Sequence, residues 1–150
     1  MTGVQTCALP ISDGLTQEAW WSPGRPFKSS LTAQSAQQLA DAYEAGTGKQ
    51  WNMTLGYAHA LIEVAMDVLK RTKDIGKKAA IRDAIAATEM DTIIGKVSWK
   101  GGPVKNVART PLVGGQWVKG KGKHKYEMLI VNNETAPVVP VQAKPKAIPY

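Results

Sequence analysis

Apolar residues recur every three to four positions in three segments of the first part of the chain. This period predicts α-helices over residues 31–48, 54–72 and 77–88. From residue 91 onward the pattern changes to short runs rich in β-branched and aromatic residues. Those runs, at 91–100, 110–119 and 126–133, predict strands, the second of them interrupted at its glycine pair.

Polar and glycine residues mark where these helices begin and end. Thr32 or Ser35 is expected to cap the first helix, and Gly46 is expected to stop it. Asp74 is the expected cap of the third helix. Residues 18–30, "EAWWSPGRPFKSS", carry two prolines and a glycine, so they predict an extended crossing segment and not a helix.

The helix predicted over 54–72 has two different faces. Its apolar stripe is the expected core face and consists of Tyr57, Leu61, Val64, Ala65 and Val68. The other stripe is polar and is formed by His59, Glu63, Asp67 and Lys70. His59 and Glu63 have the spacing of two metal ligands, but a zinc site needs a third ligand and HExxH is absent. We therefore expect a solvated face and no metal site, and we expect the same solvated position for His124.

The formal net charge of +7 raises the possibility of an anionic partner. Its densest cluster is "KGKGKHK", residues 119–125, in which lysines alternate with glycines and not with aromatic residues. Binding of single-stranded nucleic acid combines basic groups with stacking aromatics, so we expect a solvated loop between two strands and no nucleic-acid partner. No apolar run approaches the roughly 18 residues of a membrane span, so membrane insertion is not expected.

The first residues, "MTGVQTCALPI", resemble the translation of a short-read sequencing adapter. They hold no Lys or Arg before the apolar stretch, which a secretory signal requires. We exclude residues 1–11 from the reasoning on fold and function. The single cysteine of the chain, Cys7, lies among them, so no disulfide is expected.

Enzyme chemistry is not visible in the remaining residues. "GTGKQ", residues 46–50, lacks the spacing and the hydroxyl residue of a phosphate-binding loop. No Ser/His/Asp or Cys/His set is apparent, so we expect no enzyme and no cofactor. The candidate binding residues are instead the loop aromatics Trp20 and Trp21 and the "QWNM" segment at 50–53, because loop aromatics beside polar groups often line ligand clefts. Trp99 and Trp117 are expected to be packing residues on strands.

Four segments in the same order resemble a known family: "WWSPGRPFKSSLTAQSAQQLADAYEAGTGKQW", "LGYAHALIEVAMDVLKRT", "DTIIGKVSWKGGPVKNVARTPLVGGQW" and "YEMLIVNN". They are similar to the C-terminal part of bacterial ABC-transporter substrate-binding proteins, in the branch related to proteins that bind branched-chain amino acids and amides. The similarity runs from about residue 20 to residue 133.

This resemblance implies an α/β fold: an incomplete type I periplasmic-binding fold, the C-terminal portion of a two-lobed protein whose chain crosses three times between lobes. On that map residues 12–136 are the C-terminal part of the binding domain. Residues 22–97 supply helices and a strand of the first lobe, 98–136 return to the second lobe, and 137–150 form a proline-rich tail.

The resemblance also implies a function. The chain would be the solute-binding component of an ABC importer for branched-chain amino acids or small amides, located in the periplasm, with a signal peptide in a missing upstream part and a membrane permease as partner. It places Trp51 and Asn52, with Trp20 or Trp21, at the ligand, while most of the ligand site would lie upstream of residue 12. An amino-acid-sensing regulator of the same fold is the alternative, and an unrelated basic binding module is a more distant one.

Overall fold

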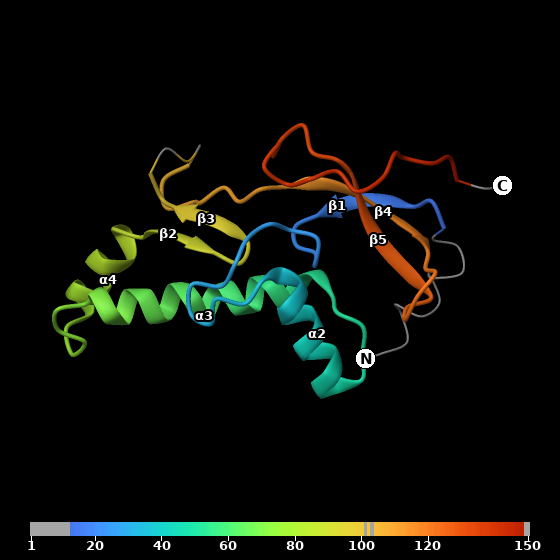
Figure 1. The fold of residues 1–150 in the computed structure, drawn as a ribbon. Helices are drawn as coiled ribbons and strands as arrows, with labels where there is room; N and C mark the ends of the chain where they lie inside the picture. The colour runs from blue at the N-terminus through green and yellow to red at the C-terminus, as the bar shows by residue number, and fades with distance from the viewer. Residues whose placement is uncertain (1–12, 101, 103, 149–150) are drawn as a thin grey trace.

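The computed structural model describes residues 13–100, 102 and 104–148 and contains the three helices expected (Figure 1). The helices are α2 (Ala36–Thr47), α3 (Met53–Arg71) and α4 (Lys78–Ala86). The strands are β1 (Thr16–Ala19), β2 (Glu89–Thr92), β3 (Gly95–Ser98), β4 (Val113–Lys119) and β5 (Tyr126–Asn132). The sequence did not predict β1. The single strand predicted over residues 91–100 is wrong, because the chain turns back at Ile93 and Ile94 and forms the antiparallel pair β2 and β3. The stretch compared with an adapter lies outside the described residues.

The helix ends agree with the sequence in part. Ser35 caps α2, since its hydroxyl accepts from the Gln38 amide while the Gln38 side chain accepts from the Ser35 amide. The helix continues past Gly46 and ends before Gly48, which has a φ of 67°. Asp74 does not cap α4: its carboxylate accepts from the amide of Gly76 in the preceding turn, and α4 has no side-chain cap.

The strands form two separate antiparallel sheets. The first has three strands in the order β1-β4-β5, and the second is the β2-β3 hairpin. β4 runs without interruption through Gly114 and Gly115, where a bulge shifts the register against β5. Gly115 suits this crowded position, because a Cβ there would meet Met128 and Ala19 at about 3 Å. The predicted break in this strand is therefore wrong.

Each sheet has its own hydrophobic cluster. The first cluster lies between α2, α3 and the hairpin and contains Trp21, Ala36, Ala40, Ala60, Ile93, Ile94 and Val97. The second lies on the three-stranded sheet and contains Ala19, Val113, Met128, Ile130, Ala136 and Val139. Trp51 packs against both clusters. In Figure 1 the hairpin and α4 lie at one end of the molecule and the three-stranded sheet at the other, while α2 lies near the start of α3.

The proline-rich end of the chain packs against the three-stranded sheet. It has no helix or strand in its described residues, yet Val139 is fully buried and the amide of Gln142 donates to the carbonyl of Ile130 at 2.8 Å. The buried amide of Gln116 donates to the carbonyl of Lys146 at 2.7 Å. The tail is extended, as expected, but part of it belongs to the core of the sheet.

Two passages of chain connect the two ends of the molecule, one around residues 20–27 and one around 99–112. Arg25 joins them. Its guanidinium donates to the carbonyl of Ala19 and, at 2.8 Å, to the carbonyl of Pro111. Arg25 is almost fully buried, and this desolvation lowers its pKa to about 10.

Candidate functional site

The long helix α3 buries part of the stripe that the sequence assigned to solvent and exposes part of the predicted core stripe. Glu63 of the polar stripe is buried beside Gly56; in the predicted core stripe Val68 is buried, but Leu61 is 70% exposed. Gly56 allows this packing, because a Cβ at that position would overlap the indole of Trp21. The prediction of a solvated stripe through Glu63 is therefore wrong.

Glu63 is a structural anchor in the interior. One carboxylate oxygen accepts from the amide and, at 2.8 Å, from the hydroxyl of Ser30, and the other accepts from the amide of Ile93 at 2.9 Å. His59 contacts the hydroxyl of Ser29 at 2.7 Å. These bonds fix the loop before α2 and the tip of the hairpin on α3. Among the described residues, no three His, Cys, Asp or Glu side chains are grouped closely enough to hold a metal ion.

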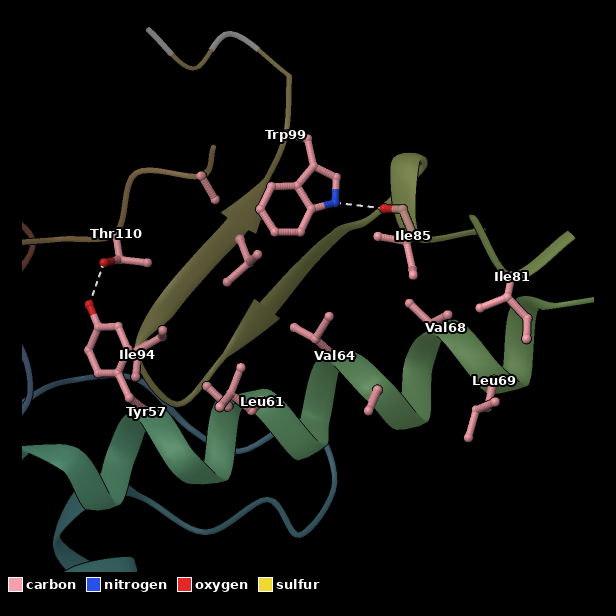
Figure 2. Close-up of a pocket in the computed structure, with 14 residues that line it drawn as sticks. Tyr57, Leu61, Val64, Val68, Leu69, Ile81, Ile85, Ile94, Trp99 and Thr110 are labelled. Carbon is pink, nitrogen blue, oxygen red and sulfur yellow. Dashed lines mark hydrogen bonds between the residues drawn. The ribbon is translucent and has the colours of Figure 1, made fainter. Parts of the chain in front are cut away.

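The apolar stripe of α3 lines an open groove of about 590 Å³ (Figure 2). Side chains of α3, α4 and the hairpin form its walls, among them Leu61, Val64, Leu69, Ile81 and Ile85. Its polar atoms are already used within the protein. The Tyr57 and Thr110 hydroxyls contact each other at 2.6 Å, and the Trp99 indole donates to the carbonyl of Ile85 at 2.6 Å.

Ligand pockets combine apolar walls with a few polar groups that orient the ligand. Because the described groove offers hydrophobic surface with its hydrogen-bonding groups paired internally, it has the character of an uncovered core face. The tryptophan region between the two clusters has a more mixed lining.

The candidate tryptophans meet where the two clusters join. Trp21 is fully buried, and its ring packs edge-on against the half-buried Trp51 at a centroid distance of 5.9 Å. Trp20, 37% exposed, points the other way and packs edge-on against Tyr57 at 6.0 Å. The structure therefore brings Trp21 and Trp51 together, and it places Trp20 beside α3.

Asn52 has a defined role at the start of α3. Its side-chain oxygen accepts from the amide of Leu55 at 3.2 Å and from the hydroxyl of Thr54, which makes it the N-cap of the helix. Asn52 directly follows Trp51 in the chain, so it lies next to the place where the two hydrophobic clusters meet.

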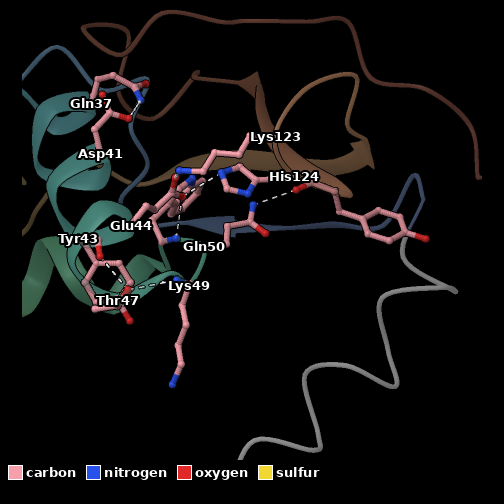
Figure 3. A network of polar contacts seen from close by, with 11 residues as sticks. Gln37, Asp41, Tyr43, Glu44, Thr47, Lys49, Gln50, Lys123 and His124 are labelled. Carbon is pink, nitrogen blue, oxygen red and sulfur yellow. Dashed lines mark hydrogen bonds and ion pairs between the residues drawn. The ribbon is translucent and has the colours of Figure 1, made fainter.

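A pocket of about 350 Å³ lies at this junction and combines Trp51 with charged groups. Glu44 of α2 accepts hydrogen bonds from the amide of Trp51 at 3.1 Å and from the ammonium of Lys123 at 2.7 Å, and one of its carboxylate oxygens lies 2.9 Å from Nε2 of His124 (Figure 3). Burial tends to raise the pKa of Glu44. The bonds from Lys123 and Trp51 and the charges nearby outweigh that effect, and the net pKa is lowered.

Sequence reasoning missed this site. His124 was expected in solvent, but its side chain is 19% exposed and lies against Glu44. Residues 119–125 do join two strands, β4 and β5, as predicted. Nothing in the local pattern of either segment indicates the contact, because Glu44 and Lys123 are separated by 79 positions in the chain.

Trp117 packs on a strand as expected, whereas Trp99 packs against a cluster from a position just outside a strand. Trp99 follows β3 and lies against the first cluster, and Trp117 of β4 lies against the second. Within the described part of the chain, no helix combines the length and the hydropathy needed to cross a bilayer.

Known structures share this arrangement, although no protein-family model and no curated protein sequence matches the chain. One is the leucine-, isoleucine-, valine-, threonine- and alanine-binding protein from Brucella ovis in its closed conformation, with a TM-score of 0.61 and 20% sequence identity. Another is an ABC-transporter solute-binding protein from R. palustris in complex with benzoate, with a TM-score of 0.58 and 17% identity. The fold is that of part of a periplasmic binding protein.

The shared region covers 95% and 89% of this chain, respectively. It covers 37% and 35% of the two solved proteins, so the chain spans little more than a third of their length. The α/β fold class predicted from the sequence is confirmed. The resemblance to ABC-transporter substrate-binding proteins is supported at the level of the fold.

Proposed function

We propose that the chain is the C-terminal part of the solute-binding component of an ABC importer, with a branched-chain amino acid or a small amide as solute. The observation that carries the proposal is its fold match to two such solute-binding proteins over nearly all of this chain and about a third of theirs. The protein would work in the periplasm and deliver its solute to a membrane permease.

The open groove on α3 supports the view that more chain completes the fold. Leu61 and Leu69 of this helix line the groove and are 70% and 47% exposed, respectively. Preceding chain of the same polypeptide is the proposed cover for this face, since the solved proteins have the additional length. Removing these side chains from water would stabilise the whole protein by roughly 25 cal/mol per Å² of apolar surface buried.

Residues 22–97 and 98–136 are proposed to belong to different lobes, with 20–27 and 99–112 as passages between them. The two separate hydrophobic clusters support this assignment, as does the pairing of β1 with β4 and not with the hairpin. Arg25 then lies at the hinge, where it ties the passages together.

Trp51, Asn52 and Trp20 or Trp21 remain the proposed solute-facing residues. Trp51 has the best geometry for that role, because it lines the pocket between the clusters. Trp21 packs edge-on against the ring of Trp51 and has no exposed surface in this chain. The groups that grip the solute's charged ends are proposed to lie in the additional chain.

Isothermal titration tests the proposal. The 150-residue chain should show no micromolar binding of leucine, valine, a short amide or urea, whereas the product of the longer gene from the same genome should bind one of them. Micromolar binding by the 150-residue chain alone would contradict the proposal that most of the solute site lies in additional chain. A longer gene that lacks a leader and a neighbouring permease would favour the sensing regulator instead.

A further inference from the structure

Arg25 is a buried cation that lacks a counter-ion within the described part of the chain. It is 3% exposed, and none of the ion pairs between described residues includes it. Its guanidinium donates instead to two main-chain carbonyls, those of Ala19 and Pro111. A buried charge is rare without an opposite charge beside it, because burial removes the water that stabilises the charge. An anion from outside the described residues is therefore expected at Arg25.

The same short segment contains three buried donors without an acceptor. They are Nε of Arg25, the hydroxyl of Ser22 and the indole nitrogen of Trp21. Among the described residues, these are the only buried side-chain nitrogens and oxygens that have no hydrogen-bond partner. A buried donor without an acceptor retains the full cost of its desolvation, so native proteins contain few of them. Their concentration within residues 21–25 indicates that an acceptor belongs at this place.

Ser22 and Arg25 are the two ends of one tight turn. The amide of Arg25 donates to the carbonyl of Ser22 at 3.2 Å, with Pro23 and Gly24 between them. The Cα atoms at the ends of such a turn lie within about 7 Å of each other, so the two side chains start close together. A carboxylate has two acceptor oxygens for these donors and supplies the negative charge that the guanidinium lacks.

We propose that Trp21, Ser22 and Arg25 bind a carboxylate, which in the longer protein belongs to an Asp or Glu side chain of the additional chain. Nε of Arg25 and the Ser22 hydroxyl donate to its oxygens, and the Trp21 indole is the third donor. The inference rests on the additional chain of the proposed function, but not on its solute.

The position of the site favours a carboxylate from the chain that covers the α3 groove. Thr110 lines one end of this groove and directly precedes Pro111, the residue whose carbonyl Arg25 binds. Tyr57 lines the same end and is close enough to Arg25 to raise its pKa slightly, although burial has the larger effect and lowers the pKa to about 10. Chain that covers this end of the groove therefore passes beside Arg25.

Formate, the smallest carboxylate, is the probe for the site in the 150-residue chain. At about 100 mM formate, a site with a Kd of about 10 mM should raise the midpoint of thermal unfolding by about 4 °C relative to sodium chloride of the same concentration. The reference salt corrects for the general effect of ionic strength.

Four variants test which residues cause this difference between the two salts. Arg25→Met should abolish it, and Ser22→Ala should reduce it to about 1 °C, because one charge-assisted hydrogen bond is lost. Ser29→Ala is the matched control, since Ser29 is buried but its hydroxyl is bonded within the chain, and Arg109→Met controls for formate at an exposed arginine. Both controls should keep the full difference. If Arg25→Met does not fold, Ser22→Ala decides. Equal midpoints of the unaltered chain in the two salts, or a formate effect that persists in Ser22→Ala, would overturn the carboxylate site.

The product of the longer gene distinguishes the source of the carboxylate. If a side chain of the additional chain occupies the site, formate should stabilise this protein no more than chloride does. A formate effect that is lost in Arg25→Met of the longer protein would show that the carboxylate comes from a small molecule, and it would overturn the assignment to the additional chain. Solute titration tests the proposed function separately. If no longer gene exists, that function and the assignment to the additional chain fail together, while the formate response of the 150-residue chain still decides whether residues 21–25 bind a carboxylate.

Discussion

The guanidinium of Arg25 donates a hydrogen bond of 2.8 Å to the carbonyl of Pro111, and this bond holds two distant passages of chain side by side. The second guanidinium nitrogen donates to the carbonyl of Ala19 at the end of β1. One buried side chain thus links a strand of the three-stranded sheet to both connections between the two clusters.

Replacing Arg25 by Met should lower the free energy of unfolding by about 2 kcal/mol. The volume is nearly kept, but two main-chain carbonyls lose a charged donor, and this loss is expected to exceed the desolvation cost that Met avoids. Urea unfolding measures the change. Arg109→Met, at an exposed position in the second passage, should stay within about 0.5 kcal/mol. An Arg25→Met chain as stable as the original would mean that desolvation of the guanidinium cancels its bonds.

Two glycines in helices should respond to alanine with opposite signs. At Gly56 a Cβ would enter the space of the Trp21 indole, so Gly56→Ala should cost about 2 kcal/mol despite the better helix propensity of alanine. At Gly46 nothing lies within 4 Å of the added Cβ, and Gly46→Ala should stabilise by about 0.5–1 kcal/mol. Thermal unfolding of the pair compares them directly. Stabilisation by both substitutions would show that Trp21 moves freely away from α3.

Glu63→Gln tests the buried carboxylate. An amide has a single acceptor oxygen, so either Ser30 or Ile93 should lose its partner, at a cost of about 2 kcal/mol. Hydrogen exchange at the Ile93 amide should accelerate if the hairpin end is the one released. Lys70→Gln, on the same stripe but exposed, serves as the reference and should change stability by less than about 0.5 kcal/mol. If Glu63→Gln and Lys70→Gln changed the stability equally, Glu63 would be solvated, as the sequence pattern indicates, and not buried.

The sequence predicted elements well where periodicity is strong and local. The three helices have a clear period, β4 and β5 have runs of β-branched and aromatic residues, and Ser35 has the features of a capping box. The hairpin of β2 and β3 was read as one strand, because its two-residue turn consists of the apolar Ile93 and Ile94. β1 was missed because "TQEA" carries little β pattern, and its partner β4 lies about 100 residues downstream. A strand that forms through such distant pairing has little local signal.

The faces of α3 could not be assigned from its own sequence. The pattern identifies an apolar stripe, but it does not identify which neighbour covers that stripe, and part of the stripe lines an open groove. Glu63 was misassigned because its partners are main-chain amides and a serine from distant segments. The contact of Glu44 with His124 was not predicted either, because the two residues lie in segments that are distant in the sequence. The candidate tryptophans, by contrast, were found from composition and loop position, and their role in binding stays a prediction.

The uncovered groove of α3 should make the isolated chain self-associate. Leu61 is 70% exposed in the middle of an apolar surface, and such surfaces promote association in water. Leu61→Glu places a charge in the groove and should lower the apparent mass seen by light scattering after size exclusion. Ile75→Glu is the matched control, because Ile75 is 68% exposed but lies outside the groove lining, and it should leave the association unchanged. If both variants behave like the original chain at concentrations up to about 100 μM, the groove does not drive association, and the argument that it is an uncovered core face loses its main support.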